Sequence, residues 1–472
     1  MSRLSSGVFL HARTICALVA LAFTSTAFAS EQADGPKLTL NAKPAYSILK
    51  SGEKQKAWMR VGLTGFHLAK EGPRSPINVA IVMDRSGSMQ GEKIQKARDA
   101  AIGALDLLKS DDIVSIIAYD SEVNVLLPAT KLTDKEHVAK IIRDIQANGN
   151  TALFGGVSKG AAEVRKFLDD KHVNRIILLS DGLANVGPSA PGELGALGAS
   201  LKKENISVST LGLGLGYNED LMVQLAGKSG GNHQFIENAS ELADIFRREF
   251  DDVLSVVAQQ VDIKVNIPEG IRPVQVLGNA ADINGQSVVT RLAQVYSDQQ
   301  KHVVIEVEIP ASMAVEAAES NDAKAAQLAT VEVTYTNMAS QKSESLTGQV
   351  SVTFSSSEEK IKASLDNAVM ADVVALVASE QSKLATDLLD SGNLEACRKK
   401  LSDNAFFLST NATALQCESL EKLADFNRIQ AKQLEGISSN GAPAAVSARK
   451  LQRAYQNATD QQAVADPAPS KP

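Results

Sequence analysis

Cysteine, aromatic residues and long apolar runs are all scarce in this chain of 472 residues. It has three cysteines, and its aromatic content is 4%, with a single tryptophan at Trp58. So few rings argue against a binding site built as an aromatic cage. The formal net charge is -7, which excludes nucleic acid as a partner on electrostatic grounds. No segment beyond the first thirty or so residues approaches the roughly 18 unbroken apolar residues of a membrane helix, so we expect no transmembrane segment in the mature chain.

Two hydrolase motifs are also missing. The sequence contains neither a GxSxG nucleophile motif nor an HExxH zinc motif, and its six histidines are scattered. We therefore expect that the protein is not an enzyme.

The N-terminal segment has the pattern of a secretory signal. Arg3 and Arg13 supply positive charge, residues 15–23 are apolar, and Ala27-Phe28-Ala29 is a small-x-small cleavage site. We expect residues 1–29 to be removed and the mature protein to be periplasmic or secreted. The alanine-rich, cysteine-poor composition favours a bacterial periplasm.

Removal of this signal leaves Cys397 and Cys417 as the cysteines of the mature chain. Because an exported protein with two cysteines often joins them, the pair is a disulfide candidate. The alternative is two buried free thiols on separate helices.

The most informative stretch is Asn78–Met89. Residues 79–83 are all apolar, which predicts a buried parallel strand, and Asp84, Ser86 and Ser88 follow at its carboxyl end. Ligands of open α/β sheets bind at such strand ends. One carboxylate and two hydroxyls are hard oxygen ligands, which suit Mg²⁺, Mn²⁺ or Ca²⁺ better than zinc.

Two later segments supply further oxygen atoms. Thr151 opens a predicted helix, and the apolar residues 176–179 form a second predicted strand that ends in Ser180-Asp181-Gly182. Three oxygens are too few for an octahedral ion, so Thr151 and Asp181 are the candidates to complete the site.

These residues, in this order and spacing, resemble the metal-ion-dependent adhesion site of von Willebrand factor A domains. The resemblance covers about residues 77–250. It implies that Ser86, Ser88 and Thr151 coordinate the ion, while Asp84 and Asp181 hold it directly or through water. One coordination position would stay open for an acidic side chain of a partner. The alternative is that these polar residues only cap helices. The segment 216–222, together with Gly230-Gly231-Asn232-His233, resembles the variant of inter-alpha-trypsin inhibitor heavy chains and many exported bacterial proteins.

The sequence predicts several structural regions. Strands alternate with helices in the middle of the chain, which predicts an α/β fold with a doubly wound, Rossmann-like parallel sheet. The flanking segments have alternating strand patterns, and the few N-terminal strands cannot be stable alone. We therefore expect the α/β domain to be inserted in a β-sandwich, although a free-standing second β domain is the alternative. The predicted regions are N-terminal sandwich strands at 36–76, the α/β domain at 77–253, the remaining sandwich strands at 256–356, a helical hairpin or bundle at 357–436, and a mostly disordered tail at 437–472 with a helical pattern at 446–455.

The functional hypothesis is an exported, divalent-cation-dependent protein-binding module of the adhesion type. The alternative is a scaffolding component of a cell-envelope complex, in which the helical region makes the main contact and the metal only stabilises the fold. A metal-dependent hydrolase is a third class, disfavoured because catalytic Mg²⁺ sites rely on carboxylates and substrate phosphates.

Overall fold

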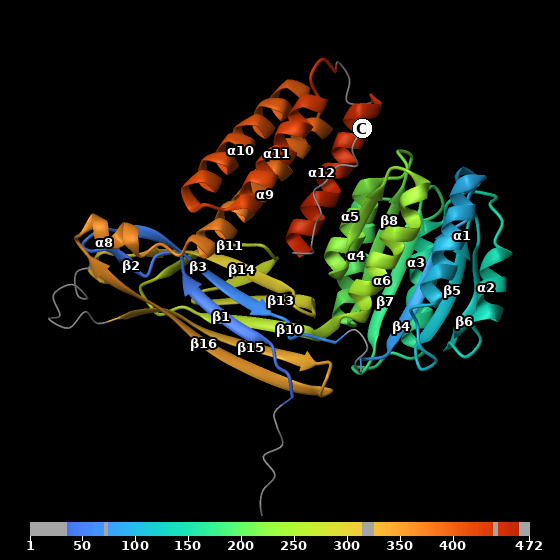
Figure 1. Cartoon of the computed structure of the whole chain (residues 1–472), viewed down its shortest axis with the longest axis horizontal. Helices are drawn as coiled ribbons and strands as arrows, with labels where there is room; N and C mark the ends of the chain where they lie inside the picture. Colours follow the sequence, from blue (N-terminus) through green and yellow to red (C-terminus); the bar gives the residue numbers. More distant parts are fainter. Residues whose placement is uncertain (1–34, 70–73, 314–324, 438–441, 462–472) are drawn as a thin grey trace, which may run out of the picture. The chain divides into compact units, whose positions relative to one another are not determined.

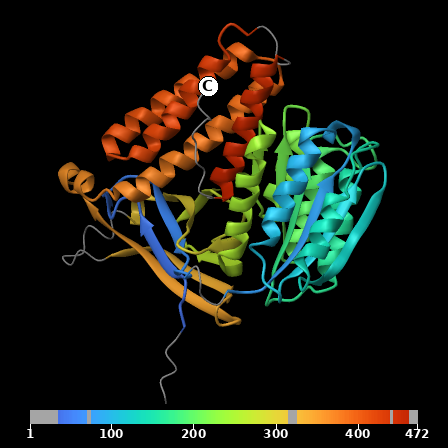
Figure 2. The same ribbon diagram turned by 45° about the vertical axis from the view of Figure 1, so that its right-hand side comes forward.

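The computed structural model describes residues 35–69, 74–313, 325–437 and 442–461 (Figures 1 and 2). The predicted signal segment 1–29, most of the connection 311–326 and the last eleven residues lie outside these ranges. No helix within the described ranges is long and apolar enough to cross a bilayer.

The α/β domain is built on a six-stranded sheet of order β6-β5-β4-β7-β8-β9. Neighbouring strands are parallel, except that β6 is antiparallel to β5 at one edge. Every residue of β4 is buried, as its continuous apolar sequence predicts. The strands are β4 (Ile77–Asp84), β5 (Ile113–Tyr119), β6 (Val123–Lys131), β7 (Val173–Ser180), β8 (Ile206–Leu213) and β9 (His233–Ile236).

Helices cover both faces of this sheet, which confirms the doubly wound α/β class. Val79 and Ile81 of β4 pack with one group of helices, and Ala80 and Val82 pack with the other, because side chains alternate along a strand. The first group is α1 (Glu92–Leu105), α2 (Lys135–Arg143) and α6 (Leu242–Leu254). The second group is α3 (Leu153–Arg165), α4 (Pro191–Lys203) and α5 (Glu219–Ser229).

Strands from before and after the α/β domain form one β-sandwich. Its sheets have the orders β1-β3-β14-β11 and β12-β13-β10-β15-β16-β2, so each sheet contains strands from both sides of the insertion. β3 pairs with β14 over ten residues, and Met59 lies opposite Ile305. The α/β domain is therefore an insertion, and the alternative of a free-standing β domain is wrong. The N-terminal strands are β1 (Thr39–Pro44), β2 (Ile48–Lys50) and β3 (Gln55–Thr64); the others are β10 (Val256–Asn266), β11 (Arg272–Leu277), β12 (Ala281–Asn284), β13 (Ser287–Tyr296), β14 (Gln300–Ile309), β15 (Ala326–Asn337) and β16 (Lys342–Ser355).

Strand β13 lies between β10 and β12, yet the sequence pattern did not reveal it. The reason is that buried positions of this strand carry polar residues, Thr290 and Gln294, so apolar residues do not alternate regularly. Gln294 has a structural partner in the α/β domain, described below.

The C-terminal region is helical, as predicted. The elements are α8 (Glu358–Ala363), α9 (Asn367–Asp390), α10 (Leu394–Leu415) and α11 (Glu418–Gln433). α9 continues without a break to Asp390, because no glycine or proline interrupts its sequence. The carboxylate of Asp366 caps α9 by accepting hydrogen bonds from the amides of Ala368 and Val369, both at 3.1 Å.

The helical pattern predicted at 446–455 lies within α12 (Pro443–Gln461), a longer helix that packs on α5, β9 and α9, so the prediction of a mostly disordered tail is wrong for the rest of this helix. Buried polar contacts hold it: Lys450 Nζ donates to the Tyr217 carbonyl at 2.6 Å and pairs with Glu219, and Asn457 accepts from the His233 amide at 2.8 Å. Because these buried contacts are polar, the sequence of α12 shows little apolar periodicity. They also bury His233.

The predicted disulfide between Cys397 and Cys417 is wrong, because both thiols are free. Cys397 lies in the first turns of α10, whereas Cys417 precedes α11, so nearly the whole length of α10 separates them. At about 1.5 Å per helical residue, the two are far beyond the roughly 7 Å between Cα atoms that a disulfide allows. Cys397 is buried and Cys417 half-buried, close to the alternative of two free thiols.

A buried polar network joins the α/β domain to the sandwich. Arg175 of β7 is fully buried and donates to Ser209 of β8 at 2.8 Å and to Gln294 and Tyr296 of β13 at 2.6 and 3.1 Å. Its guanidinium also lies 3.5 Å from the carboxylate of Glu249 on α6. One cation thus holds together two strands of the α/β sheet, its last helix and the sandwich.

Asp252 of α6 belongs to the same region, and it makes stability dependent on pH. Burial, followed by the charge of Glu249, raises the pKa of Asp252 from 3.8 to about 7. Because the folded chain holds this proton more tightly, the stabilisation is complete below the ordinary pKa and is lost as the pH rises toward 7. As the pH rises from about 4 to about 8, the free energy of unfolding of the wild type should fall. We expect it to fall less in Asp252→Asn, because asparagine cannot ionise. Urea unfolding across that range measures this difference, and parallel profiles would contradict it.

Candidate metal centre

The five residues singled out in the sequence lie at one edge of the α/β sheet. Asp84 ends β4, and Asp181 directly follows β7, which is paired with β4. The chain runs from β4 outward to β5 and β6, then returns to β7 on the other side of β4. This reversal is the switch point at which open α/β sheets bind their ligands.

Asp84 is completely buried and accepts hydrogen bonds from uncharged donors. Its Oδ1 accepts from the Ser86 amide at 2.8 Å, and its Oδ2 accepts from the Ser180 hydroxyl at 2.5 Å. Burial is the main reason why the pKa of Asp84 is raised, and the nearby charge of Asp181 adds to it. Because uncharged donors hold this carboxylate in position, its surroundings favour an added positive charge.

The two serines connect Asp84 to Asp181. The Ser86 and Ser88 hydroxyls are 3.0 Å apart, and Ser88 Oγ donates to Asp181 Oδ1 at 2.7 Å. The other carboxylate oxygen of Asp181 pairs with the ammonium of Lys93 on α1. The side chain of Asp181 is fully buried, whereas that of Lys93 is partly exposed.

Thr151 approaches the same point from a third loop. A methyl group built on Gly182 would lie 3.0 Å from Thr151 Oγ1 and 3.4 Å from Ser88 Oγ, so both hydroxyls face the small space beside this glycine. The Thr151 amide donates to Asn185 Oδ1 at 2.8 Å. The Gly87 amide donates to the Gly149 carbonyl at 3.0 Å and ties the first loop to the Thr151 loop. The structure therefore brings all five predicted residues together.

Three further residues of the site were not identified from the sequence. Ser180 orients Asp84, Asn185 orients the Thr151 loop, and Lys93 neutralises Asp181. Ser180 directly precedes Asp181 at a strand end, and that position was a usable signal. Lys93 and Asn185 gave none, because their contacts span 88 and 34 residues of sequence.

The donor set fits a hard divalent cation. Among the residues that the structure describes, no three histidine, cysteine or acidic side chains converge in the way a zinc site requires. The site instead offers two buried carboxylates and the hydroxyls of Ser86, Ser88 and Thr151, all of them oxygen donors. Within the described ranges Lys93 is the one cation bonded to these two carboxylates, which leaves one negative charge that a divalent ion would neutralise.

Comparison with known proteins assigns this part of the chain. The sequence profile of the von Willebrand factor type A domain matches residues 78–248. The chain contains a von Willebrand factor A (VWA) domain. VWA domains commonly bind a divalent metal at this site and mediate protein–protein interactions, so the protein is related to adhesion and interaction modules.

Relatives extend the likeness beyond the VWA domain. An uncharacterized protein of Synechocystis sp. is 26% identical over 378 residues, which are 75% of this chain and 86% of that protein. Inter-alpha-trypsin inhibitor heavy chain H3 of Bos taurus is 31% identical over 194 residues, which are 38% of this chain but 20% of the bovine protein. The solved structure of a von Willebrand factor type A protein from Catenulispora acidiphila has the same fold, with a TM-score of 0.65, 16% identity and coverage of 82% of this chain and 89% of that chain.

Lys93 is expected to compete with a metal ion for Asp181. Because its ammonium pairs with a carboxylate oxygen of Asp181, a divalent ion at the VWA site must share or displace that contact. We expect Lys93→Met to raise the affinity for Mg²⁺ about tenfold, which corresponds to about 1.4 kcal/mol. Isothermal titration at constant ionic strength measures this change, with Lys96→Met on the same helix as the matched control. Equal affinities in both variants would show that Lys93 does not compete.

Proposed function

We propose that this protein is exported and that its VWA domain uses a divalent cation, Mg²⁺, Mn²⁺ or Ca²⁺, to bind an acidic group of a protein partner. The supporting observation is the convergence of five oxygen-bearing residues at the switch point of the sheet. In this proposal the Ser86, Ser88 and Thr151 hydroxyls hold the ion, and Asp84 and Asp181 hold it directly or through water. A bound ion supplies a positive charge that a partner carboxylate can neutralise.

The surroundings of the site support a protein partner. Leu183 and Leu215 are 58% and 39% exposed, and each directly follows a glycine in a loop at the carboxyl ends of β7 and β8. Both loops belong to the sheet edge that carries the metal centre. Exposed leucines beside a charged centre match the mixture of apolar and polar contacts found in protein interfaces.

We propose a binding role and no catalysis. Three of the five oxygen donors are uncharged hydroxyls, so they would leave an ion's charge less compensated than a carboxylate-rich site does. An ion held in this way has a stronger need for an anionic group from a partner. That need favours capture of an acidic side chain over activation of water.

A scaffolding role is the second candidate, and the helical region supports it. Phe406 on α10 is 75% exposed and lines a groove of about 810 Å³ between α10 and α11. A large exposed ring in a groove is typical of a protein-binding surface. In this alternative the partner binds the helices, and the metal centre stabilises the VWA domain.

Partner capture by the full-length chain distinguishes the two candidates. We expect capture in Mg²⁺ to be lost with a chelator and with Asp84→Ala, but to be retained in Phe406→Ala. Asp99→Ala, an exposed position on α1, is the matched control for the loss of one carboxylate. Circular dichroism establishes that each variant is folded. Loss of capture in Phe406→Ala, together with retention in Asp84→Ala, would favour the scaffolding role.

A further inference from the structure

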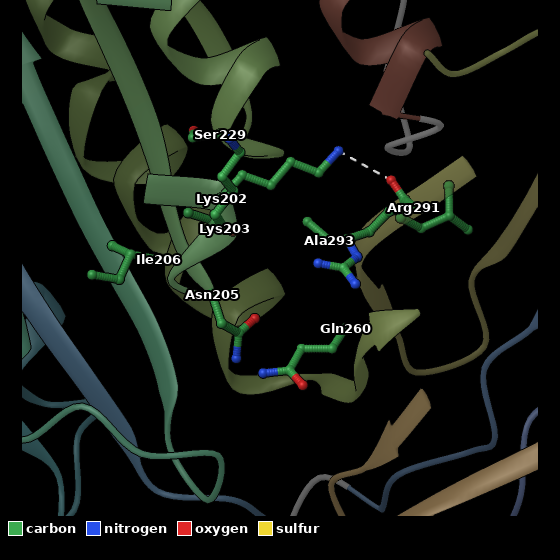
Figure 3. A pocket seen from close by; sticks show the side chains of 10 residues that line it. Lys202, Lys203, Asn205, Ile206, Ser229, Gln260, Arg291 and Ala293 are labelled. Carbon is green, nitrogen blue, oxygen red and sulfur yellow. Dashed lines mark hydrogen bonds between the residues drawn. The ribbon is translucent and has the colours of Figure 1, made fainter. Parts of the chain in front are cut away.

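A basic pocket lies near the amino end of β8 in the VWA sheet, whereas the metal centre lies at the carboxyl ends of the strands. Its volume is about 160 Å³, and its walls come from the end of α4, the start of β8, the end of α5 and the sandwich strands β10 and β13 (Figure 3). The VWA domain and the sandwich approach closely here, since a methyl group built on Gly230 would lie 2.4 Å from the Ala293 side chain. The pocket is distinct from the proposed metal centre and shares no residue with it.

The charges around this pocket are unbalanced. Lys202, Lys203 and Arg291 line it, and Asp262 is bound by Arg291 at 2.5 and 2.7 Å. Glu204 next to Lys203 is already paired with Arg165. Lys202 Nζ donates to the Arg291 carbonyl at 3.0 Å, a contact with a neutral oxygen. An excess of positive charge in a partly enclosed space attracts small anions.

The pKa of Lys202 agrees with an excess of positive charge around the pocket. Burial lowers the pKa of Lys202, and the positive charges of Arg291 and Lys228 lower it further, more than Asp262 raises it. An anion placed near the ammonium would reverse this effect, because an opposite charge favours the charged form of lysine.

The pocket also contains an amide donor that lacks an acceptor. Asn205 Nδ2 is shielded from solvent, and it makes no hydrogen bond within the structure. Asn205 has a φ of 60°, and Gln260 across the pocket has a φ of 53°, so two non-glycine residues adopt the left-handed conformation here. Figure 3 shows the Arg291 guanidinium between the Lys202 and Gln260 side chains, with both amides on the wall away from Lys202. Residues in such conformations concentrate at functional sites.

We propose that this pocket binds a small tetrahedral oxyanion such as phosphate between Arg291 and the Asn205 amide, with the Lys202 side chain turning from the Arg291 carbonyl to contact the anion from the opposite wall. The ammonium and the guanidinium donate charge-assisted hydrogen bonds, and Asn205 Nδ2 gains its missing acceptor. The same anion contacts α4 and β8 of the VWA domain and β13 of the sandwich, so its binding stabilises their junction.

Titration of the full-length chain with inorganic phosphate tests this proposal, with chloride added to keep the ionic strength constant. We expect one bound phosphate per chain and a rise in the melting temperature as phosphate increases. Lys202→Met and Asn205→Asp should each weaken binding at least tenfold. Aspartate also tolerates the left-handed conformation and differs little in shape from asparagine, so this second variant tests the site if Lys202→Met does not fold. Lys109→Met removes an exposed lysine elsewhere and is the matched control.

The comparison of ligands identifies the anion. Sulfate should bind like phosphate, because the site recognises charge and tetrahedral shape, whereas acetate should bind at least tenfold more weakly. Glycerol phosphate distinguishes the free ion from the phosphate end of a larger molecule, and binding of either form supports the site. The proposal is overturned if phosphate acts no differently from chloride, if acetate binds as tightly as phosphate, or if both pocket variants bind phosphate like the wild type.

Discussion

Replacement of Asp181 by asparagine is expected to lower the affinity of the VWA domain for Mg²⁺ by a factor between about 100 and about 4,000. Removing one charge from a buried group of interacting charges typically costs about 3–5 kcal/mol, and about 1.4 kcal/mol corresponds to a factor of ten. Asparagine keeps the shape of the side chain and can still accept from Ser88, whose hydroxyl lies 2.7 Å from Asp181. The variant should therefore fold, since Lys93, which loses its partner, is partly exposed.

Two measurements separate metal binding from folding in this variant. Isothermal titration gives the affinity, and thermal unfolding with increasing Mg²⁺ gives the stabilisation, which is about 2.7 kcal/mol at a concentration 100 times the dissociation constant. Wild type and Asp99→Asn should show this stabilisation, whereas Asp181→Asn should show almost none at the same concentration. If Mg²⁺ stabilises Asp181→Asn as strongly as wild type, then Asp181 does not hold the ion.

The second large effect concerns Arg175, which joins the VWA domain to the sandwich. Arg175→Met is expected to lower the free energy of unfolding by about 3–5 kcal/mol, because it leaves the Glu249 carboxylate buried without its cation. The substitution also removes the guanidinium nitrogen that donates hydrogen bonds to Gln294 and Tyr296 on β13. Urea unfolding measures the loss. Arg165→Met, which breaks an exposed ion pair with Glu204 in the same domain, should cost about 1 kcal/mol or less.

A double substitution tests the cause of that loss. Glu249→Gln in the Arg175→Met background removes the unpaired charge, so part of the lost stability should return. If the double variant is less stable than Arg175→Met, the unpaired carboxylate is not the source of the effect. Loss of packing around the long arginine side chain would then be the better explanation.

The α/β domain and the candidate metal centre could be predicted because local sequence determines both. Residues 79–83 are apolar without interruption, which identifies a strand buried on both faces, and Asp84 and Asp181 follow such strands directly. Parallel strands end at the same edge of a sheet. The proximity of Asp84 and Asp181 therefore follows from the strand pattern, before any contact between them is known.

The features that the sequence did not reveal depend on contacts between distant segments. Gln294 is polar at a buried position of β13 because Arg175, 119 residues away, donates to it. The sequence indicated a helix at 446–455 but not its packing, because Lys450 and Asn457 of α12 bond to groups of α5 and β9 that are more than 200 residues away. Local periodicity cannot reveal such pairs, because the residue type at each of these positions depends on a distant partner and not on neighbours in the sequence.

The insertion of the VWA domain has a consequence for proteolysis. The domain is joined to the sandwich by two peptide connections, one from β3 to β4 and one from α6 to β10. A protease that cuts either connection once produces two fragments on a denaturing gel, yet the domain remains covalently attached through the other. Cleavage at both positions is required to detach it, and the pairing of β3 with β14 would still hold the remaining halves of the sandwich together.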